Sequence, residues 1–410
     1  MTSSHHSTVA GFLVGTVVAV SSLAPASADE IGVLDNMRVS GEVGAEARTF
    51  VHNPQFDGQM DGVQPSLFAE IDIDWESVDG VDQVTITPFL RVDGRDDERT
   101  HADLREGYWR RVGKDVEILI GVNRVFWGVT ESRHLINIIN QIDQVENVDE
   151  EDFLGQPMIN LATQQDVGRF ELFVLPGVRE RTFPGRAGRL RAALAVDEDA
   201  AVYDSDLEEW DVGSALRYSH FIGDWDVGAY VFQGTGREPS LSVSSDGTRL
   251  IPRYDRITQL GLDLQYTTDA WLWKLEAIGR GGQGDAFAAT VAGFEYTLFQ
   301  IYESDADLGL LMELQYDGRD GDAPPTAADN DIFLGSRLAL NDVQDTTALL
   351  GTVIDWEDGT TSLRLEAERR VGNDWKIELE TQWLLNTADG NGLQAFEEDS
   401  FAVTRLTRFF

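Results

Sequence analysis

The sequence predicts an all-β protein whose antiparallel strands form a transmembrane up-and-down β-barrel of about 18 strands, with 16 as the alternative count. Three observations support this prediction. Apolar residues recur at every second position along much of the chain. Very short polar connections alternate with long ones, as in outer-membrane barrels. The chain opens with an apolar leader and ends in the strand-like segment Asp399 to Phe410, whose terminal Phe410 is expected to close the barrel.

The leader has the features of an export signal. Residues Val9 to Ala24 form a mostly apolar stretch without charge, followed by the small residues Ala26-Ser27-Ala28 at the cleavage positions. The segment before the stretch contains His5 and His6 but no Lys or Arg, which is atypical of a signal peptide. We therefore expect residues 1–28 to be a signal peptide and residues 29–410 to form one barrel domain.

Composition excludes several classes of protein. The chain has no cysteine, so it has neither disulfides nor thiolate metal sites. After the leader, no segment reaches the length of about 18 apolar residues that a membrane-spanning helix requires. The formal net charge is -40, which disfavours nucleic-acid binding through a basic surface. A hydrophobic content of 42% suits a barrel in which only alternate residues face lipid.

The alternation is clear in four segments: Leu67 to Trp75, Val116 to Val122, Leu308 to Leu314 and Trp375 to Trp383. In each, one face is apolar and the other carries mainly polar or charged residues, with exceptions such as Leu311. Alternation of this kind predicts strands with two chemically different faces. Because a soluble β-sandwich alternates in the same way, the pattern alone does not separate a protein core from lipid.

Connection lengths favour the membrane barrel. Outer-membrane barrels combine short periplasmic turns with long extracellular loops, and an even strand count returns the C-terminus to the periplasm. The predicted short turns are Gly113-Lys114, Gly223-Asp224, Thr268-Asp269, Ser304-Asp305 and Gly372-Asn373-Asp374, and the predicted loops are about 52–63, 93–101, 127–166, 197–209, 235–253, 318–330 and 387–398.

Tryptophans fall at the expected ends of strands. Trp75 and Trp356 come at predicted strand ends, and Trp225, Trp271 and Trp375 follow short turns. The amphipathic indole prefers the level of the lipid headgroups, so a barrel is expected to carry such residues in two girdles.

One long segment interrupts the alternation, and we expect it to be a partly helical loop at about 127–166. Its middle, Glu131 to Ile142, follows Thr130 as a potential N-cap and carries apolar residues at helical spacing. Loops of this length usually carry function. Two arrangements remain open: the loop folds into the barrel and narrows the pore, or it caps the barrel from outside.

Three stretches resemble a known group of proteins. They are GVNRVFWGVTESRHLINIINQIDQVENVDEEDFLGQPMINLA, ELFVLPGVRERTFPGR and DNDIFLGSRLALND. The sequence resembles uncharacterised proteobacterial outer-membrane β-barrel proteins of the porin-like and alginate-export-like kind. The resemblance implies location in the outer membrane of a Gram-negative bacterium and passive diffusion of solutes. It implies no catalytic residue and no particular substrate.

Strand phase yields a set of residues expected to line the pore. Charges inside a barrel require water or a partner, so these positions imply a wet or tightly paired lumen. Acids outnumber bases among them, which favours cations mildly. The set comprises Glu70, Asp72, Arg91, Glu117, Arg124, Arg133, Asp263, Glu313, Arg337, Glu366 and Glu378.

The expected function is therefore that of a porin-like channel for small hydrophilic solutes with a mild cation preference. The expected partners are outer-membrane lipid and lipopolysaccharide, the barrel-assembly machinery at the C-terminal strand, and the solutes, and the chain is a candidate homo-oligomer. The alternatives are a non-conducting structural or adhesin-type barrel and, with less support, an outer-membrane hydrolase.

Catalytic, cofactor and metal sites are not expected. Ser132, His134 and nearby acids could be drawn as a triad, but a triad is recognised by geometry, and no nucleophile elbow is present. The stretch Asp317 to Asp322 offers oxygen ligands but lacks the spacing of a calcium loop. The acidic loop Glu146 to Asp152 is expected to be solvated surface.

Overall fold

A computed structural model describes residues 36–326 and 328–410. The expected signal peptide, residues 1–28, lies outside this range. The compact unit Met37–Phe410 contains one sheet of 18 strands. Its strands are β1 Met37–Phe50, β2 Val63–Glu76, β3 Asp82–Asp93, β4 His101–Val112, β5 Glu117–Asn123, β6 Gln156–Gln165, β7 Gly168–Pro176, β9 Val212–Ile222, β10 Trp225–Thr235, β13 Arg256–Thr267, β14 Trp271–Gly281, β15 Phe287–Leu298, β16 Asp307–Asp317, β17 Asn330–Ala339, β18 Thr347–Asp355, β19 Thr361–Val371, β20 Trp375–Asn386 and β21 Phe401–Phe409.

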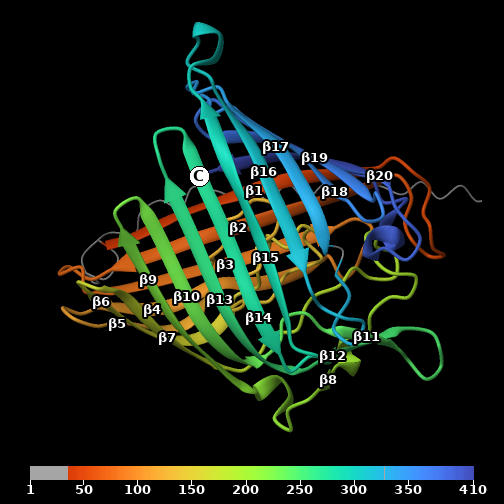
Figure 1. The fold of residues 1–410 in the computed structure, drawn as a ribbon, viewed down its shortest axis with the longest axis horizontal. Helices are drawn as coiled ribbons and strands as arrows, with labels where there is room; N and C mark the ends of the chain where they lie inside the picture. The colour runs from red at the N-terminus through yellow and green to blue at the C-terminus, as the bar shows by residue number, and fades with distance from the viewer. Residues whose placement is uncertain (1–35, 327) are drawn as a thin grey trace, which may run out of the picture. The chain divides into compact units, whose positions relative to one another are not determined.

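Consecutive strands of this sheet pair antiparallel, and the last strand returns to the first (Figure 1). The β1–β21 pairing runs from Glu42 opposite Phe409 to Phe50 opposite Phe401. The register continues to the end of the chain, where the Phe410 amide donates to the Gly41 carbonyl at 3.0 Å. Because every strand has two neighbours, the sheet has no free edge, as a strand assembly in lipid requires. The predicted all-β, 18-strand antiparallel barrel is confirmed.

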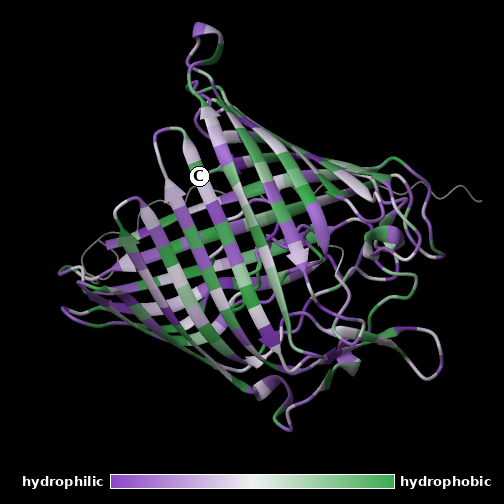
Figure 2. Cartoon of the chain, in the orientation of Figure 1, coloured by the Kyte–Doolittle hydropathy of each residue, from purple (hydrophilic) through white to green (hydrophobic). Residues whose placement is uncertain are grey.

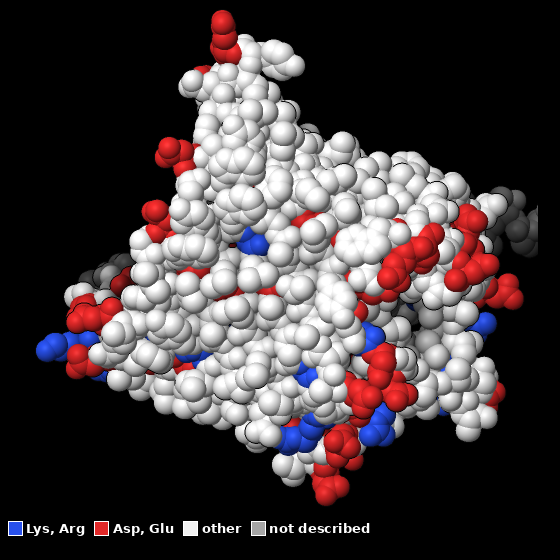
Figure 3. Space-filling model, in the orientation of Figure 1, with Lys and Arg blue, Asp and Glu red and all other residues white. Residues whose placement is uncertain are grey.

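The wall alternates in polarity along each strand (Figure 2). In β16, Leu310 and Leu314 are exposed on the outer face, whereas Glu313 between them is only 1% exposed. Successive side chains of a strand point to opposite faces, so the apolar set faces outward throughout the strand. On the side shown in Figure 3, charged atoms gather mainly near the ends of the strands, and the broad band between them is largely uncharged.

The two rims carry connections of different length. The expected short turns fall together on one rim, although the one at Ser304-Asp305 is the longer segment 299–306 with the 3-10 turn η4 Ile301–Glu303. The opposite rim carries the long loops, including 124–155 and 177–211. These loops contain a small sheet of β8 Val202–Tyr203, β11 Ser240–Val243 and β12 Leu250–Tyr254, and the 3-10 turns η2 Glu198–Ala200, η3 Glu208–Trp210 and η5 Gly392–Phe396.

The long interruption differs from its prediction in two ways. The loop spans 124–155 rather than 127–166, because residues 156–165 form β6. The inner face of β6 mixes the apolar Met158 and Ala162 with the polar Gln156 and Asn160, while Ile159 and Leu161 face outward, so the contrast in polarity between its two faces is weak. The helix expected over Glu131 to Ile142 is also absent. The amides of this segment donate instead to side chains of the barrel wall, as described below.

Candidate functional site

The loop 124–155 lies inside the barrel. Ile136 and Ile139 are 0% exposed and belong to an apolar cluster with Phe232 on β10, Ile278 on β14 and Val291 on β15. These strand residues lie on the inner face, opposite outward residues such as Trp273 and Val231. The loop therefore packs against one side of the lumen and fills that side with apolar contacts. Of the two arrangements open from the sequence, the structure has the inward one.

Two buried carboxylates of the wall hold the first half of the loop. Glu276 on β14 accepts hydrogen bonds from the amides of Val129 at 2.6 Å and Thr130 at 3.0 Å. Glu313 on β16 accepts from the amides of Glu131 and Ser132, both at 2.8 Å. Bonds between an ionised carboxylate and backbone amides are stronger than neutral ones. Within the segment predicted to be helical, the Ile136 amide also donates to Glu276, at 3.2 Å, where a helix would pair it with the Ser132 carbonyl.

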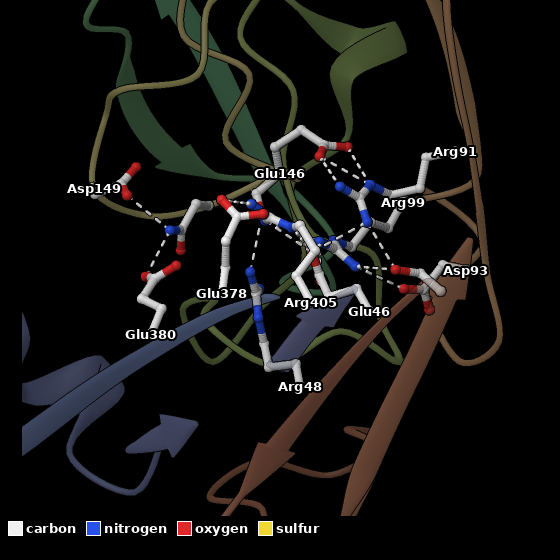
Figure 4. A network of polar contacts seen from close by, with 12 residues as sticks. Glu46, Arg48, Arg91, Asp93, Arg99, Glu146, Asp149, Glu378, Glu380 and Arg405 are labelled. Atoms are coloured by element: carbon white, nitrogen blue, oxygen red, sulfur yellow. Dashed lines mark hydrogen bonds and ion pairs between the residues drawn. The ribbon is translucent and has the colours of Figure 1, made fainter. Parts of the chain in front are cut away.

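An arginine cluster holds the second half of the loop on the other side of the lumen (Figure 4). Arg91 on β3 donates from Nε to both carboxylate oxygens of Glu146, at 2.7 and 2.8 Å. Arg99 donates to Glu46 on β1 at 2.8 Å and to the Val145 carbonyl at 2.8 Å. Burial alone would raise the pKa of Glu146, but the hydrogen bond with His101 and the charge of Arg91 hold that pKa below its usual range.

A third set of contacts ties the loop to β19 and β20. Arg364 on β19 lies 2.6 Å from Asp149, and Asn147 donates to Glu380 on β20 at 2.9 Å. The loop thus touches the wall near β14 and β16, near β1 and β3, and near β19 and β20. It crosses the bore from wall to wall and constricts it.

Beside the loop lies a polar cavity of about 200 Å³. Every basic side chain in its lining has a carboxylate partner, such as Arg105 with Asp143 at 2.7 Å and Lys376 with Glu378 at 3.0 Å. The lining residues are Glu42, Phe68, Glu70, Phe89, Arg91, Arg105, Arg124, Glu146, Asp152, Lys376, Glu378 and Arg405.

Three acids of this lining lack such a partner. The carboxylates of Glu42, Glu70 and Asp152 make no hydrogen bond or ion pair with any described residue. Glu42 and Glu70 lie directly opposite each other on β1 and β2. Lys376 and Arg405 lie near Glu42, and Arg124 and Arg105 lie near Glu70, without forming an ion pair with them.

Two neighbouring acids of the loop have shifted pKa values. Glu151 and Asp152 have exposed side chains, yet the protein around them removes much of their hydration, and Asp149 adds a like charge. Together these effects raise the pKa of Glu151 and of Asp152 to about 7. The charge in the constriction therefore changes near neutral pH.

The sequence-predicted lining residues divide into three groups by position. Glu70, Arg91, Arg124 and Glu378 border the polar cavity. Arg133, Glu313 and Arg337 contact or belong to the inserted loop, with Arg133 3.0 Å from Asp317 and Arg337 2.5 Å from Glu131. The remaining members lie on the inner face of the wall away from the cavity lining: Asp72, Glu117, Asp263 and Glu366.

Asp263 differs from the other inner-face acids because it is covered. It is 4% exposed and forms a bidentate pair with Arg217 at 2.9 and 3.0 Å, and the Arg217 guanidinium lies over the Trp127 ring of the loop. Its charge is neutralised and separated from the polar cavity.

The sequence did not reveal Glu146 as a lumen residue. It lies in the acidic stretch that was expected to be solvated, but it is 6% exposed inside the arginine cluster. Its partners come from β3, β4 and the preceding loop, all distant in sequence. No local pattern signals such a contact. The one available hint is that the loop is too long for a plain hairpin.

The geometry brings no catalytic triad together at Ser132. Its hydroxyl donates to Glu313 at 2.5 Å, and the His134 ring lies instead 3.9 Å from Glu276. No helix in the described part of the chain has the length and apolar character needed to cross a membrane.

Solved structures of outer-membrane β-barrels share this architecture. OpdQ of Pseudomonas aeruginosa aligns with a TM-score of 0.53 at 11% identity over 92% of this chain and 98% of its own. A BenF-like porin from Pseudomonas fluorescens Pf-5 gives a TM-score of 0.52 at 10% identity, over 92% of this chain and 99% of its own. The chain shares the closed β-barrel fold of these proteins.

The same fold occurs in a barrel with a different described role. Wzi of Escherichia coli, an outer-membrane protein involved in group 1 capsule assembly and described as a carbohydrate-binding β-barrel, aligns with a TM-score of 0.52 at 9% identity, over 89% of this chain and 83% of its own. No sequence-family model and no curated protein matches the chain. At these identities the likeness concerns the fold.

Proposed function

We propose that the protein is a porin-like channel of the outer membrane that lets small hydrophilic solutes diffuse passively, with a mild preference for cations. The observation that carries the proposal is the polar cavity beside the inserted loop, with Glu42, Glu70 and Asp152 unpaired in its lining. Because the apolar side of the loop seals against β10, β14 and β15, solutes would pass on the side of β1, β2, β20 and β21.

Planar-bilayer recording of the purified protein tests the channel. We expect discrete conductance steps and a reversal potential of the sign for cation preference in a KCl gradient. Selectivity then comes from pore width and lumen charge, and no bond is made or broken. Complete absence of conductance from correctly folded protein would contradict the proposal.

A non-conducting structural or adhesin-type barrel is the second candidate. It is favoured by one specific observation: the loop crosses the bore and contacts the wall on three sides. Liposome swelling with sugars of increasing size separates the two candidates. A channel admits the small sugars and excludes larger ones, whereas a plugged barrel admits none.

The remaining features of the proposal concern the cell. Residues 1–28 act as a cleaved signal peptide, the strand β21 is recognised by the barrel-assembly machinery, and the loop rim faces lipopolysaccharide. We propose no enzymatic activity. N-terminal sequencing of protein from isolated outer membranes tests cleavage before Asp29, and native mass spectrometry tests whether the barrel forms a homo-oligomer.

A further inference from the structure

Three carboxylates lie close together at the loop rim, between β17 and β18. Asp331 on β17 and Asp355 on β18 lie directly opposite each other in the antiparallel register. Asp329, two residues before Asp331, shares its face. One oxygen from each of the three side chains lies within 4.8 Å of the other two.

The arrangement concentrates negative charge where water is scarce. Asp331 is 2% exposed and Asp355 is 4% exposed. Like charges directly opposite on neighbouring strands destabilise a sheet, and burial adds a desolvation penalty for each charge. Among the described residues, no Lys, Arg or His forms an ion pair with any of the three acids. Arg133, on the nearby loop, is paired with Asp317 instead.

One buried carboxylate oxygen of this cluster lacks a hydrogen-bond partner among the described residues. The Oδ2 atom of Asp331 is buried and has no hydrogen-bond donor among the described residues. In contrast, Asp355 accepts from the amides of Glu357 at 2.7 Å and Asp358 at 3.2 Å, and from Asn391 at 3.3 Å. Asp355 is therefore held in place, while Asp331 points a free oxygen into the cluster.

A second acidic cluster in the same barrel has its negative charge balanced by arginines. His101, Asp143 and Glu146 also bring three potential ligand atoms together. There, however, Arg105 lies 2.7 Å from Asp143 and Arg91 is bonded to Glu146. Arginines neutralise that cluster, so it needs no ion. In the part of the chain that the structure describes, the rim cluster has no such partners.

We propose that Asp329, Asp331 and Asp355 bind a divalent cation, with Ca²⁺ as the preferred ion. Ca²⁺ takes six to eight oxygen ligands and accepts irregular geometry, so three carboxylates and rim water suit it better than they suit Mg²⁺. The ion would neutralise the cross-strand pair and join the connections 318–329 and 356–360. Through Asn391, which also donates to Asp358 at 3.0 Å, it would stiffen the loop 387–400. This proposal does not depend on whether the barrel conducts.

Calorimetric titration of EGTA-treated, detergent-solubilised protein with CaCl₂ tests the site. We expect one saturable site per chain in the wild type, with a dissociation constant of about 10⁻⁴ to 10⁻³ M. Asp331→Asn and Asp355→Asn should each weaken binding at least about tenfold, since each removes a charged ligand. Asp320→Asn, an equal loss of charge at an exposed position in the adjacent loop, should leave binding unchanged.

Hydrogen–deuterium exchange gives a second readout on the same samples. Ca²⁺ should slow exchange of the amides in 356–360 in the wild type and in Asp320→Asn, but not in Asp331→Asn. Heat-modifiable migration on gels checks that each variant has folded. Equal titrations of wild type and Asp331→Asn, or absence of saturable binding in the folded wild type, would overturn the proposal and indicate that the acids share protons instead.

Discussion

Single charges inside the lumen differ sharply in what their removal would cost. Glu46 is 3% exposed and is shared by three arginines, with Arg99 at 2.8 Å and Arg405 at 2.9 Å. Arg111, by contrast, is half exposed and pairs with Asp82 at 3.1 Å. Removing one member of a buried charge pair leaves the other uncompensated, whereas an exposed pair contributes little.

Glu146→Gln should therefore destabilise the folded protein by about 3 kcal/mol, because Arg91 loses its bidentate partner. Urea unfolding in lipid vesicles measures the change in the free energy of unfolding. Glu150→Gln is the matched control in the same loop, since Glu150 is exposed and lies 3.3 Å from Arg181. It should change stability by less than about 0.5 kcal/mol. Equal losses in the two variants would show that the buried cluster is not special.

The two loop acids with raised pKa values predict a pH-dependent selectivity. A carboxyl group with a pKa of about 7 is mostly protonated at pH 6 and mostly ionised at pH 8. The cation preference should therefore increase from pH 6 to pH 8, as Glu151 and Asp152 gain charge. Reversal potentials in a KCl gradient measure it. The double variant Glu151→Gln with Asp152→Asn should remove most of the pH dependence; an unchanged pH profile would assign it to other groups.

At the scale of elements, the inserted loop depends on a few wall positions. Glu313→Ala would leave two loop amides and the Ser132 hydroxyl without their acceptor. Each lost buried bond costs about 1–3 kcal/mol. We expect the first half of the loop to detach, and single-channel current to become larger or noisier. Glu117→Ala is the control, because Glu117 lies on the inner face of β5 away from the cavity lining and pairs with Arg110 on β4 at 2.6 Å. The same current noise in both variants would argue against loop detachment.

The strands were predictable from sequence where their two faces differ in polarity. β16 and β20 are examples, since their inner faces carry Glu313 and Glu378 and their outer faces leucine and isoleucine. β6 was missed because Met158 and Ala162 lie between polar residues on its inner face, which weakens the contrast with its apolar outer face. The predicted helix did not form either: Leu135, Ile138 and Ile139 are buried as expected, but the Ile136 amide in its middle donates to Glu276 and not to a backbone carbonyl.

At the scale of the whole molecule, the lumen has a dry side and a charged side. The alternation of residues along each strand predicted which charged residues face the lumen. It could not predict which of them the loop covers. Asp263 and Glu70 were equivalent in the sequence, yet one is paired and covered and the other borders the cavity. This distinction depends on where the loop 124–155 lies, and its contacts join segments far apart in the chain.

The division of the lumen into an apolar side, covered by the loop, and a charged side predicts which residues set ion selectivity. A unit charge about 10 Å from an ion in water changes its energy by about 0.4 kcal/mol, or about twofold in local concentration. Glu70→Gln should therefore lower the cation-to-anion permeability ratio by about twofold. Asp263→Asn should leave the ratio unchanged, because its charge is already neutralised by Arg217. A larger effect of the Asp263 variant than of the Glu70 variant would contradict the proposed path, because ions would then pass on the side of the loop that faces β13.

The anchoring of the loop also has a consequence for the order of assembly. The chain has completed the loop by residue 155, but the acceptors and partners on β14, β16, β19 and β20 follow much later, joined to the loop by bonds between residues 140 to 233 positions apart. Until those strands take their places, the apolar cluster around Ile136 and Ile139 lacks Ile278 of β14. Before the barrel closes, the loop 124–155 therefore lacks many of its contacts and is open to proteases. Protection of the loop from proteolysis then indicates that the last strands have joined the barrel.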